Sequence, residues 1–114
     1  ILDLFSGTGS FGIECLSRNS RSVTFVENDK NALKTLKMNI KELKLEKKTS
    51  IFDTLVFYFL EKISKIEDRY DLIFLDPPFK EENLSIFLKL LKDKKLVNKK
   101  TWLYAYLKWD YYSL

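Results

Sequence analysis

One stretch of this sequence limits the possible folds more than any other: the apolar run 72–75, which ends abruptly in Asp76-Pro77-Pro78-Phe79. A run without polar alternation is typical of a strand buried on both faces, as in a parallel sheet. The two prolines lack amide hydrogens, so the strand must end at Asp76. Ligands of open α/β sheets bind beyond the carboxyl ends of the strands. Asp76 and Phe79 are therefore predicted to lie at a ligand-binding edge.

Strand patterns alternate with helix patterns along the whole chain. Predicted strands cover residues 1–5, 23–26, 49–52, 70–76 and 101–107, and predicted helices cover 11–18, 29–44, 54–66 and 82–92. Short connections between alternating elements are typical of a doubly wound, mostly parallel α/β sheet. We therefore predict one Rossmann-like domain over residues 1–114. A cluster of aromatic residues is expected mostly in its core: Phe52, Phe57, Tyr58 and Phe59.

The composition excludes several classes of protein. Hydrophobic residues make up 46% and charged residues 32% of the chain, which indicates a globular rather than a disordered protein. No apolar run approaches the roughly 20 residues of a membrane span. Because the chain has no histidine and only one cysteine, Cys15, we expect neither a zinc site nor acid–base chemistry by histidine. The single cysteine also fits a protein of a reducing compartment. The net charge of +4 is compatible with a polyanionic partner but does not identify one.

A glycine-rich turn follows the first predicted strand. Residues 6–12, SGTGSFG, have the G-x-G-x-x-G spacing, which brings backbone amides close to a ligand and aims a helix N-terminus at it. Glu27 ends the second predicted strand about 20 residues further on, where an acid is expected to hold ribose hydroxyls. These two features suit a nicotinamide cofactor and other adenosine cofactors equally well.

Further acids favour a positively charged cofactor. Asp3 lies four residues before Gly7, where a carboxylate has little use beside a pyrophosphate but suits the ammonium end of S-adenosylmethionine; it could also cap the glycine loop. Asp53, at the end of the third predicted strand, is expected either to accept a hydrogen bond from adenine or to cap the next helix. Phe52 beside it is the one residue of the aromatic cluster that is a candidate for contact with adenine. Together with Glu27 and Asp76 these acids would gather at one rim, which is costly unless they bind a ligand.

Three blocks of the sequence resemble the bacterial 16S ribosomal RNA guanine-N2 methyltransferases. They are residues 3–14 (DLFSGTGSFGIE), 26–29 (VEND) and 71–79 (DLIFLDPPF), in the order and spacing of that family. The resemblance implies a Rossmann-like class I methyltransferase domain, here cut short at both ends, with S-adenosylmethionine as the cofactor and no metal. It also implies a cytoplasmic monomer whose partner is ribosomal RNA or the small ribosomal subunit.

The resemblance also assigns roles to single residues. The positions corresponding to cofactor-binding residues are Asp3, Ser6, Gly7, Gly9, Glu27 and Asp53. The catalytic motif corresponds to Asp76, Pro77, Pro78 and Phe79. An aromatic amine is a poor nucleophile, and acceptance of its two hydrogens by the Asp76 carboxylate and the Pro77 carbonyl would orient it and raise its electron density. Phe79 can stack on a flipped base.

Three alternatives remain open. An adenine-N6 DNA methyltransferase uses the same chemistry but commonly carries Asp-Pro-Pro-Tyr, so Phe79 favours the RNA family. A nicotinamide-dependent oxidoreductase shares the glycine loop, although Asp-Pro-Pro-Phe has no role in hydride transfer. A catalytically silent RNA-binding module could retain the fold.

Overall fold

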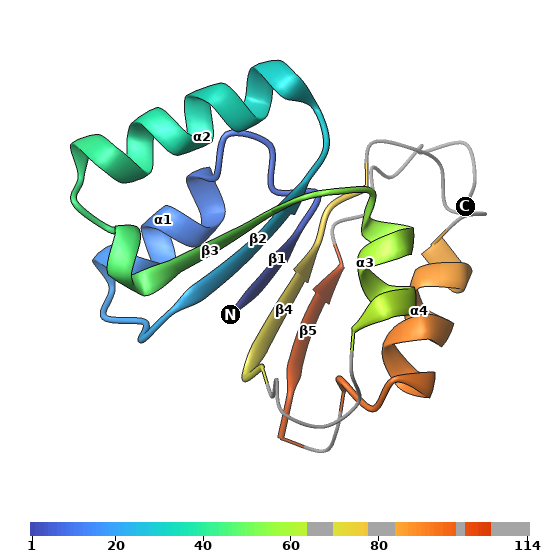
Figure 1. The fold of residues 1–114 in the computed structure, drawn as a ribbon. Coiled ribbons are helices and arrows are strands. Elements are labelled where there is room, and N and C mark those ends of the chain that lie inside the picture. The colour runs from blue at the N-terminus through green and yellow to red at the C-terminus, as the bar shows by residue number, and fades with distance from the viewer. Residues whose placement is uncertain (64–69, 78–83, 98–99, 106–114) are drawn as a thin grey trace, which may run out of the picture.

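A computed structural model of the chain describes residues 1–63, 70–77, 84–97 and 100–105, which form a parallel sheet with helices on both faces (Figure 1). The strands are β1 (Leu2–Leu4), β2 (Val23–Glu27), β3 (Thr49–Asp53), β4 (Leu72–Leu75) and β5 (Trp102–Ala105). The helices are α1 (Ser10–Ser17), α2 (Lys30–Glu42), α3 (Val56–Lys62) and α4 (Leu84–Asp93), with a short 3₁₀ helix η1 (Glu46–Lys48) before β3. The predicted alternation of strands and helices is confirmed.

The strand order sets the point at which the winding of the sheet reverses. The order is β3-β2-β1-β4-β5, and every neighbouring pair is parallel. The chain runs outward from β1 through β2 to β3, and then crosses back to begin β4 on the other side of β1. The direction of winding therefore reverses between β1 and β4, which is where α/β sheets bind ligands beyond their carboxyl ends. Leu4 and Leu75, the last residues of β1 and β4, are paired, so the chain leaves the two strands at neighbouring points.

Two cores lie on opposite faces of the sheet, because side chains alternate along each strand. Helices α1 and α2 cover one face and α3 and α4 the other (Figure 1). Phe25 packs with Leu36 in the α1–α2 core, whereas Leu4 and Leu75 belong to the core that includes α3 and α4. None of the described helices is both long enough and apolar enough to cross a membrane.

Helix α2 shows how the local sequence sets this architecture. Its buried residues Leu33, Leu36 and Ile40 recur at helical spacing and face the sheet. The carboxylate of Asp29 accepts a hydrogen bond from the Ala32 amide at 2.8 Å, which satisfies an amide that no helical carbonyl can reach. The prediction that Asp29 is the N-cap of this helix is confirmed.

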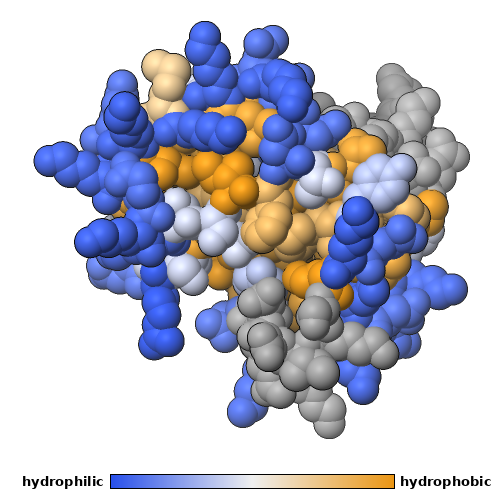
Figure 2. Space-filling view, in the orientation of Figure 1, coloured by the Kyte–Doolittle hydropathy of each residue, from blue (hydrophilic) through white to orange (hydrophobic). Residues whose placement is uncertain are grey.

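The aromatic residues near β3 and α3 correct one prediction. Phe59 is buried as expected, but Phe52, Phe57 and Tyr58 are exposed. Phe52 lies on β3, an edge strand of the described sheet, and has no further strand to pack against. Phe57 and Tyr58 lie on α3 but are not among its buried residues. Figure 2 shows apolar surface on this side of the molecule, and a hollow of about 450 Å³ here is lined in part by Phe52, Tyr58 and Phe59.

Candidate active site

The predicted site acids lie at or near the carboxyl edge of the sheet: Asp3, Glu27, Asp53 and Asp76. Asp3 pairs with Phe25 of β2 and Phe74 of β4. Glu27 comes two residues further along β2, so alternation points it the same way. Asp76 follows Phe74 by two positions and lies just after the end of β4. Asp53 pairs with Glu27 in the β2–β3 ladder. Asp3, Glu27 and Asp53 therefore lie on the face covered by α1 and α2, and Asp76 lies close enough to Asp3 to act on it as a negative charge.

The glycine loop turns tightly between β1 and α1. Gly7 and Gly9 both have left-handed backbone conformations, with φ of 57° and 85°, which glycine adopts without steric cost. The Gly9 amide donates to the Ser6 carbonyl at 2.9 Å. A Cβ on Gly9 would collide with Leu36, whereas a Cβ on Gly7 would have no atom within 4 Å. The inner side of the loop is thus closed against α2, and at Gly7 a ligand can approach the backbone.

Phe5 shows local strain at the start of this loop. Its φ of 59° lies in the left-handed region, which is rare for a bulky side chain and often marks a functional site. The Phe5 ring packs edge-on against Phe87 of α4, with 5.3 Å between the ring centroids. This packing holds the sharp turn of the chain out of β1, and nothing in the local sequence indicated it.

Asp3 lies beneath the loop, with only 1% of its surface exposed. Its Oδ2 accepts a hydrogen bond from the Gly12 amide at 3.2 Å. That amide belongs to the first turn of α1 and has no carbonyl partner within the helix, so Asp3 of β1 caps the helix. The other oxygen, Oδ1, is buried and has no hydrogen-bond partner among the described residues, and the same is true of Ser6 Oγ. The predicted capping role of Asp3 thus occupies one of its two oxygens.

Burial raises the pKa of the Asp3 carboxyl to about 7, because ionisation is costly away from water. The hydrogen bond from the Gly12 amide opposes this rise, since it favours the charged form. The negative charges of Asp76 and Glu27 add to it. A positive charge placed near the loop would therefore lower the pKa of Asp3 and favour its ionised form.

Glu27 fastens the glycine loop to the end of β2. Its Oε1 accepts from the Gly7 amide at 2.8 Å, and its Oε2 accepts from the amides of Asn28 at 3.2 Å and Asp29 at 3.0 Å. A carboxylate offers about four acceptor positions, so these three bonds orient the group and leave one position for a ligand hydroxyl.

Asp53 makes an exposed ion pair with Lys30, with 2.9 Å between Oδ2 and Nζ. Helix α3 begins after Leu55 without any side-chain cap. The alternative prediction that Asp53 caps this helix is therefore wrong. The contribution of Lys30 was not predicted, because the two residues are 23 positions apart and meet only through the β2–β3 pairing.

The predicted catalytic motif begins where β4 ends at Leu75. Asp76 is half-buried and Pro77 is buried, while Pro78 and Phe79 lie outside the described residues. Two residues before Asp76, the Phe74 ring stacks on Phe11 of α1, with centroids 3.9 Å apart.

Phe74 also stacks on Tyr104 of β5, with centroids 5.4 Å apart and ring planes within 9°. The row of three rings ties the helix after the glycine loop to the strand before Asp76, which fixes one predicted site segment against the other. The sequence did not indicate this support, because apolar periodicity does not say which rings are in contact.

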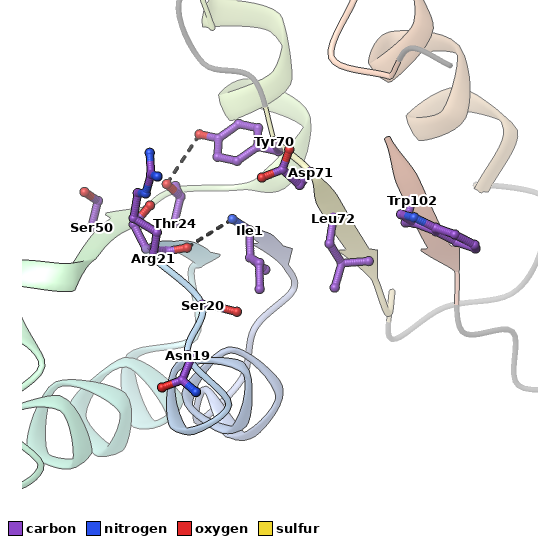
Figure 3. Close-up of a pocket in the computed structure, with 11 residues that line it drawn as sticks. Ile1, Asn19, Ser20, Arg21, Thr24, Ser50, Tyr70, Asp71, Leu72 and Trp102 are labelled. Carbon is purple, nitrogen blue, oxygen red and sulfur yellow. Dashed lines mark hydrogen bonds between the residues drawn. The ribbon is translucent and has the colours of Figure 1, made fainter. Parts of the chain in front are cut away.

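A larger hollow lies at the other end of the sheet (Figure 3). Its volume is about 970 Å³, and it is lined by residues at the amino ends of the strands, including Ile1, Thr24, Tyr70, Asp71 and Trp102. The Tyr70 hydroxyl and Thr24 Oγ1 are hydrogen bonded at 3.3 Å across it. Because parallel α/β sheets bind ligands at their carboxyl ends, this hollow is not the candidate site. Among the described residues, no group of three or more His, Cys, Asp or Glu side chains could hold a metal ion.

Comparison with known proteins gives a consistent family. The family profile described as "Conserved hypothetical protein 95" matches residues 1–109. A Bacillus subtilis protein named "Putative rRNA methyltransferase YlbH" is 38% identical over 96 residues, which cover 84% of this chain and 52% of the relative. The ribosomal RNA small subunit methyltransferase D of Buchnera aphidicola is 37% identical over 103 residues, 90% of this chain and 52% of the relative. This chain thus spans about half the length of these relatives.

More distant relatives and solved structures agree on the fold. The ribosomal RNA large subunit methyltransferase I of Klebsiella pneumoniae is 32% identical over 100 residues, 86% of this chain and 25% of the relative. A conserved hypothetical protein from Streptococcus pyogenes superposes with a TM-score of 0.81 at 28% identity, covering 91% of this chain and 63% of that one. A methyltransferase from Agrobacterium tumefaciens, described as SAM-dependent, superposes with a TM-score of 0.75 over 98% of this chain and 40% of that one. Its 23% identity shows the shared fold alone.

Proposed function

This chain belongs to the family described as Conserved hypothetical protein 95, and we propose that it is part of an enzyme that transfers a methyl group from S-adenosylmethionine to ribosomal RNA. Two relatives with at least 37% identity carry names of ribosomal RNA methyltransferases, which supports this substrate class. Residues 1–114 would form part of a single methyltransferase domain.

The observation that carries the proposal is the position of the glycine loop beside Asp76. Strands β1 and β4 are neighbours at the point where the winding reverses, so a ligand on the loop would lie next to the residues that follow β4. A nicotinamide enzyme needs the loop but has no use for Asp76-Pro77, and a silent binding module needs no acid there. Both alternatives are therefore less well supported than a transferase.

The residues present fit S-adenosylmethionine. Gly7 leaves its backbone open to a ligand, and Glu27 retains an acceptor position for a ribose hydroxyl. The unpartnered Oδ1 of Asp3 and the Oγ of Ser6 lie at the base of the loop, where a buried carboxylate favours a cationic group over a phosphate. Asp53 would accept a hydrogen bond from adenine after giving up its ion pair with Lys30.

The chemistry asked of this chain is mainly positioning. When bound, S-adenosylmethionine supplies an electrophilic methyl group. Asp76 would accept a hydrogen bond from the substrate amine, and the Pro77 carbonyl would accept the second. These contacts orient the nitrogen lone pair and raise its electron density, which is the electrostatic and proximity contribution that such a transfer needs. Phe79 is proposed to stack on the flipped base.

We propose the exocyclic N2 amine of a guanine in 16S ribosomal RNA as the target. The sequence of the motif after β4 supports an exocyclic amine, and the name of the Buchnera relative supports the small subunit. A relative named for the large subunit aligns over a similar share of the chain, so an experiment has to decide which ribosomal subunit is the substrate.

The test is transfer of a labelled methyl group by the full-length protein to undermethylated small and large ribosomal subunits and, in parallel, to unmethylated DNA, followed by identification of the modified nucleoside. We expect N2-methylguanosine in the small subunit. Label on adenine N6 of DNA would instead support the DNA enzyme. Absence of transfer to any nucleic acid, by a protein that binds S-adenosylhomocysteine, would support the silent module.

A variant pair assigns the role of Asp76. Asp76→Ala should reduce methyl transfer by at least 100-fold, on the order of a lost transition-state contact, while S-adenosylhomocysteine binding changes little. Asp71→Ala is the matched control, because Asp71 is exposed and precedes β4 at its opposite end. If Asp76→Ala retained full transfer, the role proposed for Asp76 would be wrong.

A further inference from the structure

The buried carboxylate of Asp3 is surrounded by groups that oppose its ionisation. Glu27 from β2 and Asp76 after β4 both act on it as negative charges, and the thiol of Cys15 on α1 is a further acidic group within range. The Gly12 amide is the hydrogen-bond donor that favours its charged form. None of the charges that act on Asp3 from the described part of the chain is positive. A proton on Asp3 therefore relieves an unfavourable cluster.

We propose that Asp3 carries a proton in the free protein and releases it to the solvent when a ligand with a positively charged amino group binds at the glycine loop. The inference rests on the proposed function, because it takes S-adenosylmethionine and S-adenosylhomocysteine as the ligands. It adds that Asp3 distinguishes ligands by the presence of an ammonium group and couples their binding to the release of a proton.

The geometry supplies the reason for this coupling. Asp3 Oδ1 is buried and unpartnered beneath the loop, where the low dielectric strengthens the attraction between a carboxylate and a nearby cation. The backbone at Gly7 is open to a ligand. The proton passes from Asp3 to the buffer and the ligand keeps its own ammonium protons, so one negative charge forms opposite one positive charge.

The size of the effect follows from the free carboxyl, whose pKa is about 7. If the bound ligand lowers that pKa well below 6, binding releases roughly half a proton at pH 7 and nearly one at pH 6. Affinity for S-adenosylhomocysteine should then rise about tenfold between pH 6 and pH 8. An adenosine ligand without the charged ammonium group of the amino-acid tail, such as 5′-methylthioadenosine, should release almost no proton.

Titration calorimetry of the full chain at pH 7, in phosphate and in Tris, measures the protons released, because the two buffers ionise with different heats. We expect about half a proton per S-adenosylhomocysteine bound and close to none for 5′-methylthioadenosine. Asp3→Asn should bind S-adenosylhomocysteine without proton release and with little pH dependence. Asp71→Asn should behave like the unmodified protein.

The outcomes separate this inference from the proposed function. Binding of S-adenosylhomocysteine without proton release, or with the same release from Asp3→Asn, overturns the inference and leaves the proposed function standing. Equal release with 5′-methylthioadenosine overturns the role of the amino group. Failure of the folded protein to bind S-adenosylhomocysteine removes both proposals. If Asp3→Asn does not fold, the comparison of the two ligands on the unmodified protein still decides.

Discussion

Gly12 allows helix α1 to approach β2 closely. The substitution Gly12→Ala, which adds one methyl group, tests this contact. A Cβ on Gly12 would lie 2.5 and 2.8 Å from two ring carbons of Phe25 and 2.8 Å from Cγ1 of Val23. Carbon atoms in contact are ordinarily about 3.5–4.0 Å apart, so the neighbours would have to move by roughly 1 Å. Both neighbours are fully buried. The Phe25 ring also lies 3.3 Å from the Cβ position of Gly9, which leaves it little room to retreat.

The magnitude of Gly12→Ala follows from two opposing effects. Alanine is more favourable than glycine within a helix by about 1 kcal/mol, whereas overpacking a core costs about 1–3 kcal/mol. Three contacts under 3.0 Å with buried groups place the cost at the upper end. We expect a net loss of about 2 kcal/mol in the free energy of unfolding, and a Tm lower by roughly 8 °C.

Gly7→Ala is the matched comparison. Gly7 has a left-handed φ of 57° but no atom within 4 Å of an added Cβ. Alanine there should therefore introduce only backbone strain, which costs about 1–2 kcal/mol of stability. Its effect should therefore be no larger than that of Gly12→Ala, and it should not depend on the size of residue 25.

The assay is urea unfolding of the full chain followed by circular dichroism. A double-mutant cycle with Phe25→Leu identifies the cause, because a smaller side chain makes room for the added methyl group. We expect the two changes to couple favourably by at least about 0.5 kcal/mol. A Gly12→Ala protein as stable as the unmodified one, or strictly additive effects in the cycle, would refute the reasoning.

Three further outcomes follow from the hydrogen bonds and charges. The pKa of Asp3 is raised from 3.8 to about 7, so the folded protein holds more protons than the unfolded chain within that window and loses stability as pH rises through it. The free energy of unfolding in urea should therefore shift in favour of Asp3→Asn, relative to the unmodified protein, by roughly 3 kcal/mol between pH 5 and pH 8. A difference between the two proteins that does not change with pH would contradict this. Asp29→Ala should cost about 1 kcal/mol, because the N-cap bond of α2 is lost; Asp29→Asn, which can still cap, should cost much less. Lys30→Ala breaks an ion pair whose side chains are 83% and 41% exposed, so it should cost under about 1 kcal/mol and show no effect at high salt.

Much of the candidate site could be predicted because its signals are local. Asp76 follows directly after a buried run and precedes a proline, which marks the end of β4 without reference to distant residues. Glu27 ends a short apolar run at the spacing expected from the glycine loop. Pairing in the structure then placed Glu27 on one face with Asp3, and Asp76 close to Asp3.

Other parts of the site depend on contacts between distant residues. Asp53 had two open interpretations, and the choice required knowing that β2 and β3 pair in a register that brings it to Lys30. Exposure of Phe52 depended on β3 being the edge strand, because an apolar side chain is buried only where another element covers it.

By itself the sequence determined the alternation of strands and helices, the tight loop of glycines and the acids that end the strands. Each of these follows from steric and hydrophobic preferences that act over a few residues. Only the tertiary structure decided that β4 lies beside β1, that one oxygen of Asp3 is paired and the other is not, and that Glu27 is held by three amides. The strand order and the half-paired Asp3 arise from packing and hydrogen bonding summed over residues far apart in the chain, and the Gly7 bond to Glu27 spans 20 positions.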